Sequence, residues 1–359
     1  MVLDFAKEAI QNAATHSINF DDLRAGKANI KVFGVGGMGC NAVTWLFNKG
    51  ISGATIYGVN TDALHLSITK ADEKVLIGKE LTRGLGAGGM PARGREAAKE
   101  SISELKRAAT GADMVFVLAG MGGGSGTGAA PVIGQLAKES GAVVIAVVTM
   151  PFECEKARIE KAEFGLQELT EVVDTAIVLD NNRLVDIAGN LPVEQAFAVA
   201  NELVSTMIKG IVETITLPSL INLDYADVSA IMKNGDVAVI GVGESDTSSR
   251  VEEAVKQALT HPLLDVDYRG ATGALIHVTC GPDFKLEEFS GVGELVTENI
   301  SPDAQVIIGA RINKDFANRV RVITIMTGVS SPYILGKKSF REETKAPSEM
   351  SDLGIEVFR

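Results

Sequence analysis

A glycine-rich segment at residues 120–128 (GMGGGSGTG) constrains this chain more than any other feature. It holds six glycines in nine residues, between a strand-like apolar run at 113–119 and a predicted helix at 127–140. Glycine adopts positive φ at little cost, so successive backbone N–H groups can turn onto one anion, and the following helix adds its positive N-terminus. A flexible linker is the alternative, but linkers are not normally framed by a buried strand and a helix. We therefore predict a phosphate-binding loop.

This loop lacks the lysine of a P-loop, and the pattern GxxxxGK[ST] occurs nowhere in the sequence. The chain is therefore not predicted to be a P-loop NTPase. Phosphate charge would be met instead by backbone amides, a helix dipole and a metal ion, which for triphosphates is usually Mg²⁺ that keeps much of its water. We expect the metal to be held by the phosphates rather than by protein side chains.

A second glycine loop, at residues 34–39, directly follows a strand-like run and precedes a predicted helix that ends near Gly50. Taken alone, this loop matches GxGxxG, and Asp62 lies 23 residues beyond it. That spacing is typical of dinucleotide-binding proteins, so an NAD(P)-dependent oxidoreductase is an alternative interpretation.

A third glycine segment, at residues 83–89, follows the predicted strand 74–77. Two glycine loops that can each bind phosphate favour one polyphosphate held from two sides. The third glycine segment could close over its terminal phosphate. Two features argue against NAD: Asp62 lies in the segment 60–63 after its strand, and the loop at 120–128 is a second, stronger candidate for phosphate binding.

Composition and charge exclude several classes of protein. The chain has 359 residues, of which 46% are apolar, enough for a sizeable core and two domains. A net charge of -12 argues against nucleic-acid partners.

The longest apolar run, 142–148, is too short to span a bilayer, and the N-terminus lacks a signal-like core, so we expect a cytoplasmic protein. Single cysteines and four scattered histidines predict neither disulfides nor a zinc site.

Apolar runs alternate with helical stretches through the first half of the chain, which predicts an α/β fold with a doubly wound, parallel sheet. The predicted strands are 30–33, 55–59, 74–77, 114–118, 143–148 and 175–179. Ligands bind beyond the carboxyl ends of such strands, and all three glycine segments fall there.

One long helix is predicted at residues 192–217, where apolar residues that include Phe197 recur at helical spacing. Beyond it, apolar runs predict strands in a second, α+β domain. We divide the chain into an N-terminal extension, a nucleotide-binding domain, the central helix, a C-terminal domain and a polar tail with a docking peptide at its tip. Their respective ranges are 1–29, 30–191, 192–217, 218–330 and 331–359.

Asp224 and Asp227 stand three residues apart before a predicted helix, so a helical conformation would place them on one face. They can be ordinary helix-start carboxylates favoured by the dipole. If Asn201 lies near the bound base, the helix continues for about 15 residues, or roughly 22 Å, before this pair is reached. The pair should then not reach the phosphates bound by its own molecule. It could orient a hydrolytic water at a neighbour's nucleotide, and such head-to-tail contacts generate open filaments.

The residues resemble the FtsZ family, the prokaryotic relatives of tubulin, and look closest to its archaeal members. Residues 120–128 look like the family signature GGGTGTG, with Ser125 in place of the first threonine. Further family segments match in order and spacing, from about residue 30 to residue 330: 34–41, 60–63, 84–89, 222–227 and 261–277. The resemblance implies a tubulin/FtsZ-type fold with a Rossmann-like GTPase domain, a central helix and an α+β C-terminal domain. It also implies GTP or GDP as ligand, Mg²⁺, and self-assembly into division filaments.

Residues are assigned to the nucleotide by this resemblance. The expected contacts are Gly34, Gly36, Gly37, Met38, Asn41, Asn60, Asp62, Ala87, Gly88, Gly89, Gly120, Gly122, Gly123, Gly124, Ser125, Gly126, Thr127, Glu155, Arg158, Asn181 and Asn201. The expected catalytic residues are Asn222, Asp224 and Asp227, acting on the GTP of the neighbouring subunit.

Several positions depart from the family pattern. Lys156 replaces the glycine that usually follows the glutamate, Asp180 replaces a proline, and Met90 replaces an asparagine. Asn201 stands where many members have an aspartate that binds guanine. A neutral amide bonds guanine more weakly than a carboxylate does. We therefore predict that this chain selects guanine over other bases less strongly.

The expected partners are other copies of this chain, in a head-to-tail homopolymer, and a membrane-adaptor protein bound through residues 350–359. Direct membrane insertion is not expected, and the protein should concentrate at the division site. Two alternatives stay open beside a polymerising GTPase: the NAD(P) oxidoreductase, and a scaffold of the same fold that binds GTP without hydrolysing it.

Overall fold

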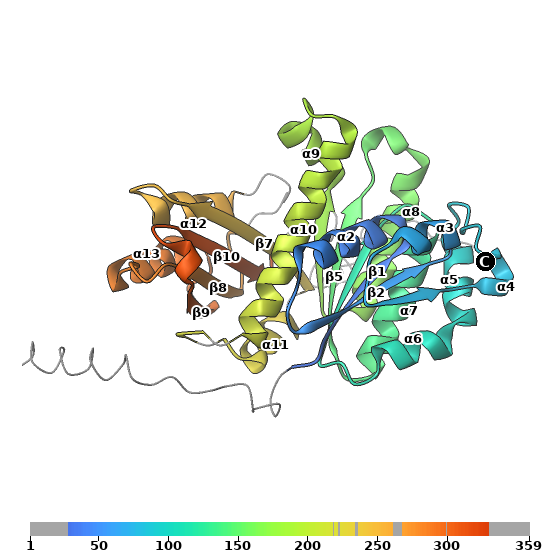
Figure 1. Cartoon of the computed structure of the whole chain (residues 1–359), viewed down its shortest axis with the longest axis horizontal. Coiled ribbons are helices and arrows are strands. Elements are labelled where there is room, and N and C mark those ends of the chain that lie inside the picture. The colour runs from blue at the N-terminus through green and yellow to red at the C-terminus, as the bar shows by residue number, and fades with distance from the viewer. Residues whose placement is uncertain are drawn as a thin grey trace, which may run out of the picture.

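The computed structural model describes residues 28–217, 219–221, 223–233, 236–260, 268–298 and 300–329. Within these ranges ten strands form one sheet in the order β3-β2-β1-β4-β5-β6-β7-β10-β8-β9 (Figure 1). Residues 1–27 of the expected N-terminal extension, residue 330, and the whole expected tail at 331–359 with its docking peptide lie outside the described residues.

The first six strands are parallel and confirm the predicted Rossmann-like α/β sheet. They are β1 (Ile30–Val35), β2 (Ala54–Asn60), β3 (Glu73–Leu76), β4 (Met114–Gly120), β5 (Val143–Met150) and β6 (Thr175–Asp180). β1 lies between β2 and β4, so the strand order reverses at the β1–β4 pair, where Gly34 is in register with Leu118. A ligand crevice is expected beyond the carboxyl ends of these two strands.

Helices cover both faces of this sheet, which explains why its central strands are buried and largely apolar. All six residues of β1 are buried: Phe33 and Val35 face one helical layer, and Ile30 and Val32 face the other. The first layer comprises α5 (Pro91–Glu100), α6 (Ile102–Ala109), α7 (Ser125–Glu139) and α8 (Ala157–Val172). The second comprises α2 (Gly36–Lys49), α9 (Asn181–Ala188), α10 (Val193–Thr216) and α11 (Tyr225–Lys233). Two short helices follow β2 and β3: α3 (Ala63–Ile68) and α4 (Lys79–Thr82).

The predicted central helix is α10, a single helix of 24 residues that lies between the two parts of the molecule (Figure 1). Its buried stripe includes Met207, Ile208 and Ile211, as the helical spacing predicts. Near its N-terminus the prediction is wrong, because Phe197 belongs to the same stripe yet is 42% exposed. At that end α10 extends beyond the sheet, so the strands no longer cover its apolar stripe.

The second part of the sheet contains β7 (Asp236–Ser245), β8 (Gly273–Cys280), β9 (Gln305–Ile312) and β10 (Val320–Thr327). β10 is antiparallel to both β7 and β8, whereas β8 and β9 are parallel. One face is covered by α12 (Arg250–Leu259) and α13 (Leu286–Thr297), and the other packs against α10. The approach of α10 is close, because a Cβ at Gly210 would lie 2.2 Å from Cδ1 of Ile323.

Among the described residues, no helix is both long and apolar enough to cross a bilayer. The three cysteines are free: Cys40 and Cys280 are buried, and Cys154 is exposed.

Candidate functional site

Two glycine loops meet where the strand order reverses. The loop after β1 runs into α2, and the loop after β4 runs into α7. Gly36 has a φ of +71°, and a Cβ at this position would lie 2.7 Å from the backbone nitrogen of Gly126. The two loops are therefore in direct contact, and only glycine fits at the junction.

These loops form the floor of a cavity of about 380 Å³, within the size range of sites that bind small molecules. Eleven of the residues predicted to contact the nucleotide line it: Gly37, Met38, Gly120, Gly123, Gly124, Ser125, Gly126, Glu155, Arg158, Asn181 and Asn201. They come from segments far apart in the sequence, so the fold alone brings them together. Other lining residues were not predicted: Met121, Thr149, Pro151, Phe152, Phe197 and Ala200.

One end of the cavity is suited to phosphate. The N-terminus of α7 begins at Ser125, and its first turn contains no acidic residue, so its free backbone N–H groups and helix dipole are available to an anion. The hydroxyl of Ser125 lies 2.6 Å from that of Thr61, in the loop after β2. Thr61 was not predicted, although its place directly after a strand is the signal that could have identified it.

The other end of the cavity is suited to a base. Asn201 of α10 and Asn181, the first residue of α9, both line it. The rings of Phe152 and Phe197 lie edge to face with their centroids 6.0 Å apart. Phe197 is one helical turn before Asn201, so it shares the face of α10 that faces the cavity. Asp180, which replaces the family proline, caps α9 by accepting a hydrogen bond from the backbone N–H of Asn182 at 2.8 Å.

Glu155 and Arg158 form an ion pair at the rim, with a distance of 2.5 Å between Oε1 and Nη1. Glu155 also accepts a hydrogen bond from the backbone N–H of Phe152 at 3.0 Å, which fixes the turn after β5. Lys156, where the family usually has glycine, has a φ of +23°. That region disfavours side chains, so lysine is strained at this position in a way that glycine would not be.

The third glycine segment supports the floor without lining the cavity. Ala87 is buried, and a Cβ at Gly124 would lie 2.7 Å from the Ala87 Cβ. Lys161 of α8 donates a hydrogen bond to the carbonyl oxygen of Gly89 at 2.9 Å. Gly88 and Gly89 both have positive φ, and neither lines the cavity.

The remaining predicted contacts do not line the cavity. Thr127 is 1% exposed, and its hydroxyl has no hydrogen-bond partner among the described residues, so it faces the interior rather than the cavity. Asp62 caps α3 by accepting from the backbone N–H of His65 at 3.0 Å. The others outside the lining are Gly34, Gly36, Asn41, Asn60, Ala87, Gly88, Gly89 and Gly122.

The predicted acidic pair straddles the start of α11, since Asp227 lies in the first turn of the helix and Asp224 does not. Asp224 precedes the helix, and its Oδ1 accepts from the backbone N–H of Asp227 at 2.8 Å. The backbone N–H of Asp224 in turn points to Oδ2 of Asp227 at 3.3 Å. The two side chains therefore cap the helix reciprocally, instead of sharing a helical face as we expected. Asn222, the third predicted catalytic residue, lies outside the described residues.

The acidic pair and the cavity lie at opposite ends of β4. Tyr225, next to Asp224, donates a hydrogen bond to the carbonyl oxygen of Asp113 at 2.7 Å, directly before β4 begins. Gly120, which ends β4, lines the cavity. Seven residues of strand separate these points by about 20 Å, at roughly 3.3 Å per residue. Asp224 therefore lies too far from the cavity to act on a ligand bound in its own molecule.

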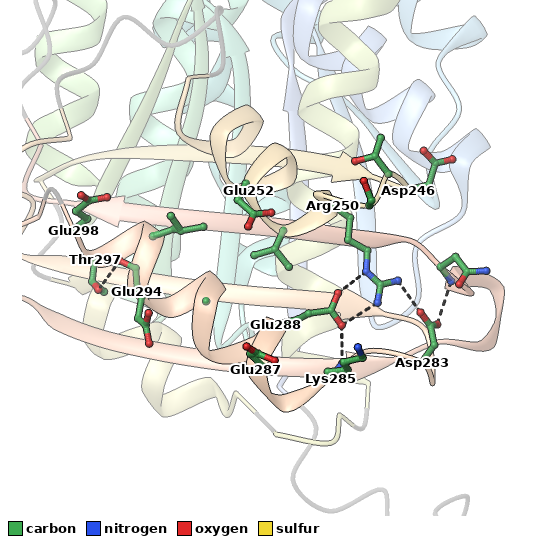
Figure 2. A pocket seen from close by; sticks show the side chains of 16 residues that line it. Asp246, Arg250, Glu252, Asp283, Lys285, Glu287, Glu288, Glu294, Thr297 and Glu298 are labelled. Atoms are coloured by element: carbon green, nitrogen blue, oxygen red, sulfur yellow. Dashed lines mark hydrogen bonds and ion pairs between the residues drawn. The ribbon is translucent and has the colours of Figure 1, made fainter.

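A larger hollow of about 1210 Å³ lies between α12 and α13, but its chemistry does not suit a nucleotide (Figure 2). Its cations are Arg250 and Lys285. Arg250 bonds Glu288 and Asp283, each at 2.7 Å, and this contact lowers the pKa of the Glu288 carboxyl. The further acidic residues on its walls are Asp246, Glu252, Glu287, Glu294 and Glu298. Polyphosphate would be repelled by this surplus of negative charge.

Comparison with known proteins agrees with this geometry. The Tubulin/FtsZ family GTPase domain matches residues 29–189, and the FtsZ family C-terminal domain matches residues 236–330. The chain is 50% identical over 340 residues to "Cell division protein FtsZ 2" of Methanocaldococcus jannaschii, covering 94% of this chain and 89% of that protein. It is 54% identical over 324 residues to "Cell division protein FtsZ 1" of Pyrococcus abyssi, covering 90% and 86%.

Solved structures agree as well. The structure described as "FtsZ dimer, empty" from M. jannaschii superposes with a TM-score of 0.80 at 49% identity, covering 90% of this chain and 92% of that one. CetZ1 of Haloferax volcanii shares only the fold, with a TM-score of 0.74 at 22% identity over 88% and 98%. These matches overturn the oxidoreductase interpretation, and the chain belongs to the tubulin/FtsZ family of GTPases.

Proposed function

We propose that this chain binds GTP in the cavity at the β1–β4 switch point, assembles head to tail into filaments of a cell-division cytoskeleton, and hydrolyses GTP where two subunits meet. The observation that carries the proposal is the separation of the cavity from the Asp224–Asp227 pair by the length of β4. The relatives' names, which describe cell division proteins, support the cellular role.

The phosphates would lie on the N-terminus of α7, where backbone N–H groups replace the missing lysine. Glu155 is the only acidic residue among the described residues that line the cavity, and it is paired with Arg158. No cluster of three acidic, histidine or cysteine side chains suited to a metal occurs in the described ranges. This donor set fits Mg²⁺ that would be held chiefly by phosphate oxygens and water, to which the Ser125 hydroxyl could add a protein oxygen. When bound, Mg²⁺ would neutralise phosphate charge.

The base would lie between Asn181 and Asn201, against the ring of Phe197. The side-chain oxygen of Asn201 can accept a hydrogen bond from a guanine N–H, and its amide can donate to a guanine acceptor. Because this amide is neutral, we expect weaker discrimination between guanine and other purines than a carboxylate would give.

Hydrolysis would require a second subunit. Asp224 and Asp227 of one molecule would approach the cavity of the next and orient a water for in-line attack on the terminal phosphate. Such a contact joins two different surfaces, so it repeats without closing and produces a filament. Asp224 is exposed and Asp227 is partly exposed, as this role requires, although their carboxylates also cap α11.

Residues 350–359 would bind a membrane adaptor, which would hold the filament at the division site on the cytoplasmic side. The support is the apolar character of this peptide at the end of a polar tail, through Leu353, Ile355, Val357 and Phe358. Deleting residues 350–359 should spare polymerisation and abolish adaptor binding.

The decisive experiment measures phosphate release per molecule over a range of protein concentrations, together with sedimentation in GTP, in GDP and without nucleotide. We expect the specific rate to rise with concentration and the protein to pellet with GTP. A full specific rate in a dilute, monomeric sample would refute the shared site. Assembly and GTP binding without turnover would indicate a scaffold that does not hydrolyse GTP.

A further inference from the structure

His65, a residue with no assigned role in this site, joins two of the predicted nucleotide contacts. It lies on α3, partly buried, and each ring nitrogen meets an asparagine from a different segment. Nδ1 lies 3.2 Å from Nδ2 of Asn60, at the end of β2, and Nε2 lies 3.1 Å from Oδ1 of Asn41, on α2. The three side chains form one hydrogen-bond chain.

The orientation of the Asn60 amide is fixed by its own backbone. Its Oδ1 accepts from the N–H groups of Thr61, at 2.9 Å, and of Asp62, at 3.3 Å. The reversed amide would place an NH₂ group against these two donors, which is unfavourable. Nδ2 must therefore face His65, and it also lies 3.9 Å from Sγ of Cys40.

This orientation determines the tautomer of His65. Because Nδ2 of Asn60 can only donate, Nδ1 of the ring must accept, so the proton of the neutral ring is on Nε2. Nε2–H then donates to Asn41, and the oxygen is the only atom of the Asn41 amide that can accept it. The backbone N–H groups of Thr61 and Asp62 thus orient the Asn41 amide indirectly, through Asn60 and His65. No contact with a ligand is needed.

Asn41 is placed to use this orientation. It follows Met38 and Gly37 by three and four residues on α2, so it lies on the face of that helix that lines the cavity. Its oxygen is occupied by His65, which leaves the NH₂ group for a ligand. A free asparagine would present its oxygen or its nitrogen with similar ease.

We propose that His65 is a positioning residue that locks Asn41 as a hydrogen-bond donor to an acceptor oxygen of the bound guanosine nucleotide. The inference rests on the proposed function, since it takes the cavity to be the nucleotide site. His65 does not touch the nucleotide and acts only through Asn41.

The test measures the equilibrium affinity for fluorescently labelled GDP, which needs neither hydrolysis nor assembly. His65→Ala should weaken binding by about 3- to 10-fold, the effect of one hydrogen bond. His65→Gln, whose amide can accept from Asn60 and donate to Asn41, should recover most of the loss. Asn41→Asp, which can still accept from His65 but no longer donates, should weaken binding at least as much as Asn41→Ala.

The double variant separates positioning from a general effect on the fold. On the Asn41→Ala background, His65→Ala should cause no further loss of GDP affinity. Ser67→Ala, on the same helix, is the matched control and should bind GDP as the native chain does. An equal loss from His65→Ala on both backgrounds would overturn the inference, as would full affinity of His65→Ala. Failure of the native chain to bind GDP would instead refute the proposed function.

Discussion

Asp224 and Asp227 each accept the backbone N–H of the other, at 2.8 Å for the Asp227 N–H and 3.3 Å for the Asp224 N–H. The pair that we propose to act on a neighbour's GTP therefore also begins α11. A loss of activity on mutation could arise from either role, so the substitution must separate charge from capping.

Asp224→Asn makes this separation because asparagine caps a helix about as well as aspartate does. We expect GTP turnover in the assembled state to fall by about 100-fold or more, as for loss of a general base. The free energy of unfolding should change by less than about 0.5 kcal/mol. Asp224→Ala should lose the same activity and, in addition, about 1 kcal/mol of stability. Phosphate release and urea unfolding measure the two effects, and native turnover in Asp224→Asn would exclude a catalytic role for the Asp224 carboxylate.

Two inactive chains should complement each other if the site is shared. Gly123 lines the cavity, and a Cβ there would meet no atom within 4 Å, so Gly123→Trp should fill the cavity without disturbing the loop. Mixed with Asp224→Ala, it should restore part of the GTPase activity, because an intact cavity can meet an intact acidic pair. Co-pelleting without any recovery of phosphate release would count against a composite site.

Phe197 should contribute to nucleotide affinity through its ring. Phe197→Ala should weaken GDP binding by about 1–3 kcal/mol, the range measured when an aromatic side chain under a base is removed. Val193→Ala, one turn earlier on α10, removes an apolar side chain that is 73% exposed and does not line the cavity. Equal affinities of the two variants, measured by titration with labelled GDP, would show that the ring does not contact the base.

His277 should make the protein sensitive to acid. Burial, and to a lesser extent the charge of Arg311, lowers its pKa to about 4, and its Nδ1 has no hydrogen-bond partner among the described residues. Between pH 6.5 and pH 4 the unfolded state binds this proton and the folded state does not, so stability falls as the pH falls. The loss should reach about 3 kcal/mol, at 1.36 kcal/mol per pKa unit.

His277→Met removes this titration and serves as the comparison. The free energy of unfolding should be measured across this pH range by chemical denaturation. Its slope against pH should be smaller in the variant, by an amount that corresponds to about one proton. If the free energy of unfolding depends on pH in the same way for the native chain and the variant, His277 has the same pKa in the folded and unfolded states.

Much of the fold was predictable because its signals are local. Strand runs, glycine loops and a helical stripe within a helix of 24 residues each follow from the nearby sequence, and buried parallel strands are largely apolar. The cavity floor followed too, since parallel strands end at one edge of a sheet. Ser125 and Gly123 lie where that rule places them.

The rest depended on contacts that periodicity does not describe. Phe197 has the spacing of a core residue, and only the position of the sheet shows that the helix extends beyond it. Thr61 and His65 act through partners in other segments, at 2.6 Å to Ser125 and 3.1 Å to Asn41. Spacing placed Asp224 and Asp227 on one helical face, but it could not show that the first precedes the helix.

The bond from Tyr225 to Asp113 has a mechanical consequence. β4 is held at its start by this bond, is buried along its first six residues, and ends in the floor of the cavity. A close-packed strand transmits displacement because its neighbours leave it little room to yield. In the proposed filament, a pull exerted on α11 by an adjoining subunit would be carried along β4 to Gly120, beneath the proposed phosphate site, and would strain the loops that hold the nucleotide.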